Sequence, residues 1–134
     1  MNNELYQIGF LMMESPPKHS LTIGRDVRAC GLGQALRDAG FNVIEVSEYS
    51  DGIRSLVECM PQVVIISEDV PEVWHPGAIA TLKEGEDVPV LVMGSGEEDS
   101  LLAAIERGAD GYLDRRASSR EQVARIRAVL RRWE

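Results

Sequence analysis

The chain has 134 residues, of which 44% are hydrophobic and 27% are charged, and its formal net charge at pH 7 is -8. This length and composition predict one globular domain with a hydrophobic core of its own. The negative charge argues against direct nucleic-acid binding by the domain, although residues 114–134 contain seven arginines and three acidic residues.

The targeting and cysteine signals are those of an intracellular protein. No stretch reaches the length of a membrane span, and the first residues lack the features of a signal peptide. Cys30 and Cys59 do not have metal-ligand spacing, so we expect small, buried, reduced thiols. A cytoplasmic location without membrane contact is therefore expected.

Apolar segments typical of strands alternate with amphipathic segments typical of helices. Pro16 and Pro17 separate the first predicted strand from the first predicted helix. Gly40 marks the end of that helix. The expected strands are residues 5–13, 43–46, 63–66, 88–93 and 111–113. The expected helices are residues 23–39, 51–60, 78–84, 97–107 and 119–132.

The most informative strand is residues 63–66, four consecutive β-branched residues without a polar break. Such a run is typical of a strand buried on both faces in the middle of a parallel sheet. Ser67, Glu68 and Asp69 follow it, at the end where open α/β sheets place their functional sites. The alternation predicts an α/β fold, a doubly wound five-stranded parallel sheet, and a single domain over residues 1–134.

Several segments together resemble the receiver domain of two-component response regulators, with its flavodoxin-like (CheY-like) sheet. Pro61 and Pro71 flank the third strand as in that family. The resemblance is strongest in the last third of the chain, which includes residues 106–113 (ERGADGYL) and residues 119–132 (SREQVARIRAVLRR). The run at residues 119–132 is similar to the final helix of receivers that precede winged-helix DNA-binding domains. The resemblance covers nearly the whole chain, and it leaves open a longer transcription regulator of which this is the N-terminal part.

The resemblance implies a phosphoryl-transfer site, but the matching positions depart from the family pattern. In receivers, an aspartate after the third strand accepts the phosphoryl group, and an acidic pair after the first strand binds Mg²⁺. A hydroxyl residue after the fourth strand and a lysine after the fifth bind the phosphate. The matching positions here are Ser67 for the acceptor, Met12 and Met13 with Glu14 for the acidic pair, Gly94 and Ser95 for the hydroxyl, and Arg115 for the lysine.

These departures predict a pseudo-receiver that acts without phosphorylation. Thioethers are poor ligands for Mg²⁺, and a serine hydroxyl needs a base before it can act as a nucleophile. We therefore expect a signalling module that is not an enzyme and has neither a metal nor a cofactor. The first alternative is a working phosphoswitch whose acceptor has shifted to Asp69.

The resemblance also implies a homodimer, formed through the fourth helix, the fifth strand and the fifth helix, or a contact with other signalling proteins. Tyr112 matches the family's switch aromatic. An ordinary solvated helix face is the competing interpretation of the charged positions. The candidate dimer residues are Glu106, Arg107, Asp110, Glu121, Arg125, Arg127 and Arg131.

A second alternative is a small-ligand domain with the same type of sheet, such as a cobalamin-binding domain. Residues 17–22 around His19 lack the aspartate and glycine of its D-x-H-x-x-G loop. Residues 15–24 are expected to form a long first loop. This loop would either fill the pocket that binds Mg²⁺ in receivers or bind a ligand there. Trp74 is expected either in contact with a partner or packed onto a neighbouring proline.

Overall fold

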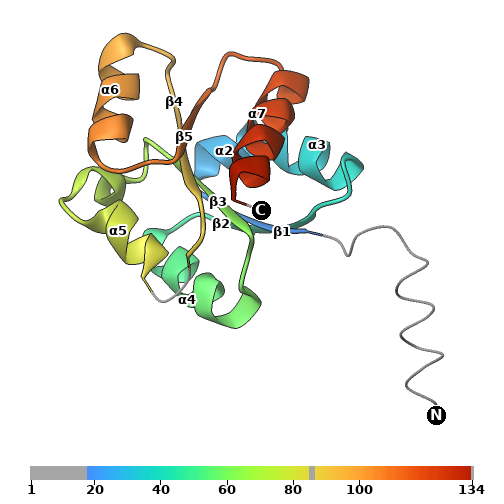
Figure 1. Cartoon of the computed structure of the whole chain (residues 1–134), viewed down its shortest axis with the longest axis horizontal. Helices are drawn as coiled ribbons and strands as arrows, with labels where there is room; N and C mark the ends of the chain where they lie inside the picture. Colours follow the sequence, from blue (N-terminus) through green and yellow to red (C-terminus); the bar gives the residue numbers. More distant parts are fainter. Residues whose placement is uncertain (1–17, 85–86, 134) are drawn as a thin grey trace.

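The computed structural model describes residues 18–84 and 87–133, in which strands alternate with helices along the chain (Figure 1). The strands are β1 (His19–Ile23), β2 (Asn42–Val46), β3 (Val63–Ser67), β4 (Val90–Gly94) and β5 (Gly111–Asp114). The helices are α2 (Arg25–Ala29), α3 (Leu32–Asp38), α4 (Tyr49–Cys59), the 3-10 helix η1 (Pro71–Trp74), α5 (Ala78–Lys83), α6 (Glu98–Glu106) and α7 (Ser119–Arg132).

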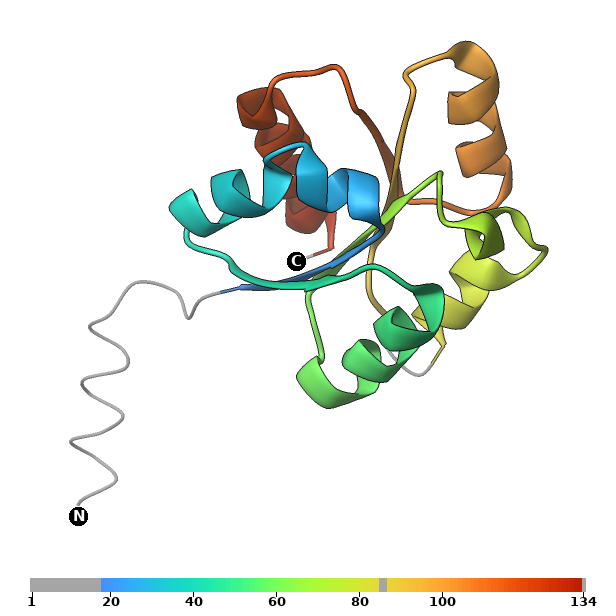
Figure 2. The ribbon, with the colours of Figure 1, turned by 180° about the vertical axis from the view of Figure 1, so that it is seen from behind.

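All strand pairs are parallel, and the strand order is β2-β1-β3-β4-β5. Helices α2, α3 and α7 cover one face of the sheet, and α4, α5 and α6 cover the other (Figure 2). The chain runs from β1 outward to β2 and then crosses to β3 on the other side of β1. The exit loops of β1 and β3 therefore diverge, and such a switch point opens a crevice at the carboxyl edge of the sheet.

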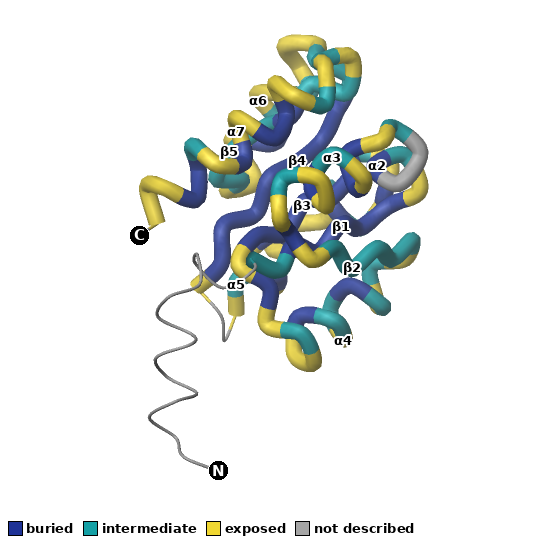
Figure 3. Tube along the Cα trace, turned by 90° about the vertical axis from the view of Figure 1, so that its right-hand side faces the viewer, coloured by how far each residue is buried: buried dark blue, intermediate teal, exposed yellow. Residues whose placement is uncertain are grey.

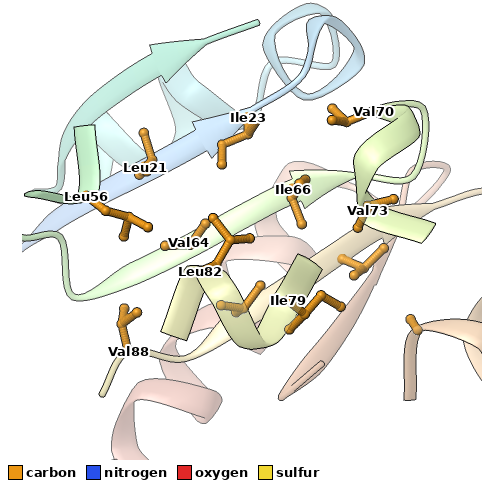
Figure 4. Packing of buried hydrophobic residues seen from close by; sticks show 13 residues of the cluster. Leu21, Ile23, Leu56, Val64, Ile66, Val70, Val73, Ile79, Leu82 and Val88 are labelled. Atoms are coloured by element: carbon orange, nitrogen blue, oxygen red, sulfur yellow. The ribbon is translucent and has the colours of Figure 1, made fainter. Parts of the chain in front are cut away.

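Two apolar layers hold the helices on the sheet. One side contains Leu56, Ile79 and Leu82 from the helices, packed on residues such as Val64 and Ile66 (Figure 4). The other side is built by α2, α3 and α7 in the same way. All five residues of β3 are buried, and β3 and β4 form the dark centre of the molecule in Figure 3. The prediction of a doubly covered central strand is therefore confirmed.

The first strand of the sheet is β1 (His19–Ile23), whereas the sequence predicted residues 5–13, which lie outside the described residues. β1 occupies the place between β2 and β3. Its hydroxyl residues Ser20 and Thr22 are buried with their apolar neighbours. The expected long loop over residues 15–24 is consequently wrong for residues 19–23.

Other differences are local. The single helix predicted over residues 23–39 is two helices, α2 and α3, that are separated at Cys30 and Gly31. Cys30 and Cys59 are free thiols as expected, but both are partly exposed rather than buried. Ser118 caps the last helix, because its Oγ accepts a hydrogen bond of 3.1 Å from the Glu121 amide. None of the helices in the described ranges is long and apolar enough to cross a membrane.

Candidate functional site

The candidate site lies at the carboxyl edge of the sheet, where β1, β3, β4 and β5 end side by side. Because the strands are parallel, their exit loops meet at this edge. The structure places Ser67, Gly94, Ser95 and Arg115 at this edge. Met12, Met13 and Glu14 lie outside the described residues.

The position of β1 corrects the assignment of the acidic pair to Met12 and Met13. The residues that follow the first strand are Gly24 and Arg25, and then Asp26. Gly24 carries no side chain, and Arg25 carries a positive charge and lies 3.7 Å from Glu48. Of these three residues, Asp26 alone offers a carboxylate. The apolar run at residues 5–13 was the stronger strand signal, and it shifted the expected position.

Ser67, at the acceptor position, is buried and already bonded. Its Oγ accepts a hydrogen bond of 3.1 Å from the Asp69 amide, and it lies 3.5 Å from Asp69 Oδ2. The Gly24 backbone closes over it, because a Cβ on Gly24 would lie 2.7 Å from Ser67 Cβ. The hydroxyl therefore caps the turn after β3.

Arg115 holds the acidic side chains of this edge together. Its Nη2 donates to Asp69 Oδ2 at 2.9 Å and lies 3.4 Å from Asp26 Oδ2 and 3.7 Å from Glu68 Oε1. The Arg115 guanidinium thus faces three carboxylates. It occupies the central position that a cation coordinated by these carboxylates would need. Within residues 18–84 and 87–133, no group of three or more His, Cys, Asp or Glu is arranged to hold a metal ion.

Glu68 connects the exit loop of β3 to those of β4 and β5. Its Oε1 accepts a hydrogen bond of 2.8 Å from the Ser95 amide, and its Oε2 accepts one from the Ser100 hydroxyl. Ser100 Oγ lies 2.7 Å from Tyr112 Oη, which accepts a 2.8 Å bond from the Gly96 amide. Tyr112 therefore lies inward, in contact with the site.

Gly94, which replaces the family's hydroxyl residue, leaves the space for this network. A Cβ on Gly94 would lie 2.6 Å from Glu68 Oε2, and at least as close to Tyr112 Oη and Ser100 Oγ. Real Cβ atoms do not approach other atoms so closely, so a larger residue would displace these side chains. The contacts of Glu68 with Ser95 and Ser100 were not predicted, although the glycine at this position was a signal that the space was used differently.

The remaining residues of the edge complete the electrostatics. Hydrogen bonds from the side chain and the backbone amide of Arg116 hold the pKa of Asp114 below its ordinary value.

Trp74 is packed inward rather than exposed, and its Nε1 donates a 2.9 Å bond to the Glu68 carbonyl. An open cleft of about 560 Å³ lies between the β1 and β3 exits, beside Arg25, Asp26 and Arg115.

The candidate dimer residues do not all share one surface. Arg127 Nη2 donates to the Ala39 carbonyl at 3.3 Å, so this arginine lies over α3 rather than beside β5. Asp110 is bonded internally, to Lys83 Nζ at 2.8 Å and to the Val90 amide at 2.8 Å. Glu121 and Arg125 form an exposed ion pair of 3.7 Å within α7. Arg131, one turn after Arg127, and Glu106 and Arg107 are exposed.

A feature that the sequence analysis missed is an apolar strip on α6. Leu101, Leu102 and Ile105 are 36%, 46% and 58% exposed. They lie within one turn of each other on the outer surface of the helix, where α6 appears largely exposed in Figure 3. Large apolar side chains gathered on one exposed surface indicate a contact site more strongly than scattered ones do.

The comparisons with known proteins agree with this geometry. No family model matches the chain. The phosphate regulon transcriptional regulatory protein PhoB of Escherichia coli is 33% identical over 101 residues, which cover 72% of this chain and 44% of PhoB. The transcriptional regulatory protein PrrA of Mycobacterium tuberculosis is 32% identical over 103 residues, which cover 75% of this chain and 44% of PrrA. The chain thus spans less than half the length of these relatives.

Solved receiver structures share the fold. The receiver domain of the response regulator NarL from Mycobacterium tuberculosis has a TM-score of 0.70 at 19% identity, over 87% of this chain and 98% of that one. A two-component response regulator from Clostridium difficile has a TM-score of 0.75 at 20% identity, with the same coverage. The chain therefore belongs to the family of response-regulator receiver domains, the receiving modules of two-component signalling.

Proposed function

We propose that this receiver domain works without aspartyl phosphorylation, as a protein-contact module of a signalling or transcription regulator. The observation that carries the proposal is the state of the acceptor position. Ser67 is buried beneath Gly24 and its hydroxyl is bonded to the Asp69 amide. The pairing of Arg115 with Asp26 and Asp69 supports the same conclusion, because these carboxylates already have a counter-charge.

The two alternatives have less support. Asp69 is about half exposed, but its Oδ2 is engaged by Arg115 at 2.9 Å. His19, the histidine considered for a cobalamin loop, begins β1 and therefore lies at the amino-terminal edge of the sheet, opposite the cleft. We propose a cytoplasmic module that does not itself bind nucleic acid, in keeping with the net charge of -8.

The test is intact-protein mass spectrometry after incubation with acetyl phosphate and Mg²⁺. We expect an unchanged mass, because the Ser67 hydroxyl is buried beneath Gly24 and already accepts a hydrogen bond from the Asp69 amide. A receiver that retains the acceptor aspartate and the acidic pair, treated in parallel, is the positive control. A stoichiometric adduct that hydroxylamine removes would contradict the proposal. Loss of that adduct in Asp69→Asn would assign the acceptor to Asp69.

We further propose that the contact surface is the α6–β5–α7 face, defined here by Leu101, Leu102 and Ile105 of α6 with Glu121 and Arg125 of α7. The first three supply apolar area, and the last two supply opposite charges. In a two-fold dimer, both copies would use this same surface. The opposite charges would then set the orientation of the partners more than they strengthen the contact. Asp110 and Arg127, which bond within the domain, are not assigned to this face.

Replacing Ile105 with glutamate is expected to weaken self-association at least tenfold, because each copy places a charge in the apolar contact. Sedimentation equilibrium of the wild type and the variant measures the effect. Val57→Glu is the matched control, since Val57 is 78% exposed and lies on α4, away from α6. Equal association of all three proteins, or a wild type that stays monomeric at high concentration, would rule out this dimer.

A further inference from the structure

We infer that Glu68 supplies a permanent internal anion to the cradle formed by the exit loops of β4 and β5. The cradle consists of the Ser95 amide, the Ser100 hydroxyl and the Arg115 guanidinium. The cradle therefore includes Arg115 and lies beside Gly94. These two positions match the phosphate-binding residues of the family. The inference rests on the proposed function, because it assumes that no external phosphoryl group occupies the cradle. The Glu68 carboxylate takes that place instead.

The surroundings of Glu68 are those of a bound anion. Its side chain is only 16% exposed. Burial of a charged carboxylate is unfavourable unless hydrogen-bond donors and a counter-charge surround it. Here each carboxylate oxygen accepts a hydrogen bond, one from the Ser95 amide and the other from Ser100, and Arg115 Nη2 lies 3.7 Å away. The charge is therefore satisfied from two segments of the chain, the β4–α6 loop with the first turn of α6 and the exit loop of β5.

The anion fixes the position of Tyr112. Ser100 lies between the Glu68 carboxylate and Tyr112 Oη, at 2.7 Å from the latter. Tyr112 Oη in turn accepts a hydrogen bond from the Gly96 amide, so the β4–α6 loop is held at two successive backbone amides. With Glu68 in place, the loop, the first turn of α6 and the tyrosine form one bonded unit.

This unit couples the cradle to the α6–β5–α7 face. The loop at Ser95 and Gly96 leads directly into α6, which carries the exposed strip Leu101, Leu102 and Ile105. Tyr112 belongs to β5, the middle element of the same face. A carboxylate in the cradle thus holds the contact surface in one arrangement without any covalent modification. Loss of the carboxylate would release both the loop and the tyrosine.

The test removes the carboxylate and then returns an anion from solution. In Glu68→Ala, we expect amide hydrogen exchange of Ser95 and Gly96, followed by NMR, to rise at least tenfold. Acetate should bind the emptied cradle and reverse most of this rise, whereas chloride at equal ionic strength should not. Glu58→Gln is the matched control, because Glu58 is an exposed acid on the outer surface of α4.

A second variant covers the case in which Glu68→Ala does not fold. Glu68→Gln keeps the shape and one acceptor oxygen but removes the charge, and we expect a large change in the Ser95 amide chemical shift. Unchanged exchange in Glu68→Ala, or an unchanged Ser95 shift in Glu68→Gln, would overturn the inference. The acetyl phosphate experiment on the wild type is separate. A phosphoryl adduct there defeats the proposed function, whereas a failure here with no adduct defeats only the role of Glu68.

Discussion

Replacing Gly24 with alanine is expected to lower the free energy of unfolding by about 3 kcal/mol. The backbone at Gly24 has φ +121° and ψ 148°, a conformation that is essentially restricted to glycine. The new Cβ would also lie 2.7 Å from Ser67 Cβ and 3.2 Å from Val70 Cγ2. Backbone strain and overpacking therefore act together, and urea denaturation measures their sum.

Gly40→Ala gives the cost of a positive φ without a steric contact. Gly40 also has a positive φ, +94°, but its Cβ would meet no atom within 4 Å, so this variant reports strain alone. We expect Gly24→Ala to cost more than Gly40→Ala by at least about 1 kcal/mol. The excess should shrink when Ser67 is also changed to glycine. Equal losses at Gly24 and Gly40 would show that the contact with Ser67 has no energetic weight.

This prediction bears on the proposed function. In the family, the residues after the first strand carry the acids that bind Mg²⁺, and in this chain the first such residue is Gly24. A side chain at this position collides with the residue at the acceptor position, so an acid cannot be added there without loss of stability. The departure from the family pattern is therefore built into the packing of β1 against β3 rather than limited to the chemistry of Ser67.

The fold was largely predictable because the buried strands have strong local signals. The β-branched run at residues 63–66 and the apolar residues 88–93 correspond to β3 and β4. β1 was missed because Ser20 and Thr22 interrupt its apolar pattern, although both are buried. Ser20 Oγ donates to the Asn42 carbonyl at 3.3 Å, a contact with β2 that the sequence alone does not reveal.

The site was predictable only in part, for a different reason. Ser67, Gly94 and Arg115 were placed by the resemblance to receiver domains, whose site positions follow the ends of the third, fourth and fifth strands. The bond between Glu68 and Ser100 joins residues 32 positions apart, and it depends on the empty space at Gly94. The pairing of Arg115 with Asp26 likewise required the correct position of β1. Contacts of this kind follow from packing, not from local pattern.

Gly94→Thr, which restores a hydroxyl residue typical of the family, is expected to destabilise the domain by about 2 kcal/mol, since it disrupts several hydrogen bonds worth about 1 kcal/mol each. The added side chain occupies the space between Glu68 Oε2, Ser100 Oγ and Tyr112 Oη. The Glu68 carboxylate must then leave the cradle, and Tyr112 loses its inward bond. Urea denaturation measures the loss, and the chemical shifts of Ser95 and Gly96 report the displaced network.

A double-mutant cycle shows whether the loss arises from Glu68. In a Glu68→Ala background the carboxylate is already absent, so Gly94→Thr should cost less than in the wild type by at least about 1 kcal/mol. The remaining cost reflects crowding of Ser100 and Tyr112, which lie equally close to the new side chain. An unchanged cost in the Glu68→Ala background would mean that Gly94 makes room only for Ser100 and Tyr112. In that case the glycine would serve the packing of β5 rather than an anion in the cradle.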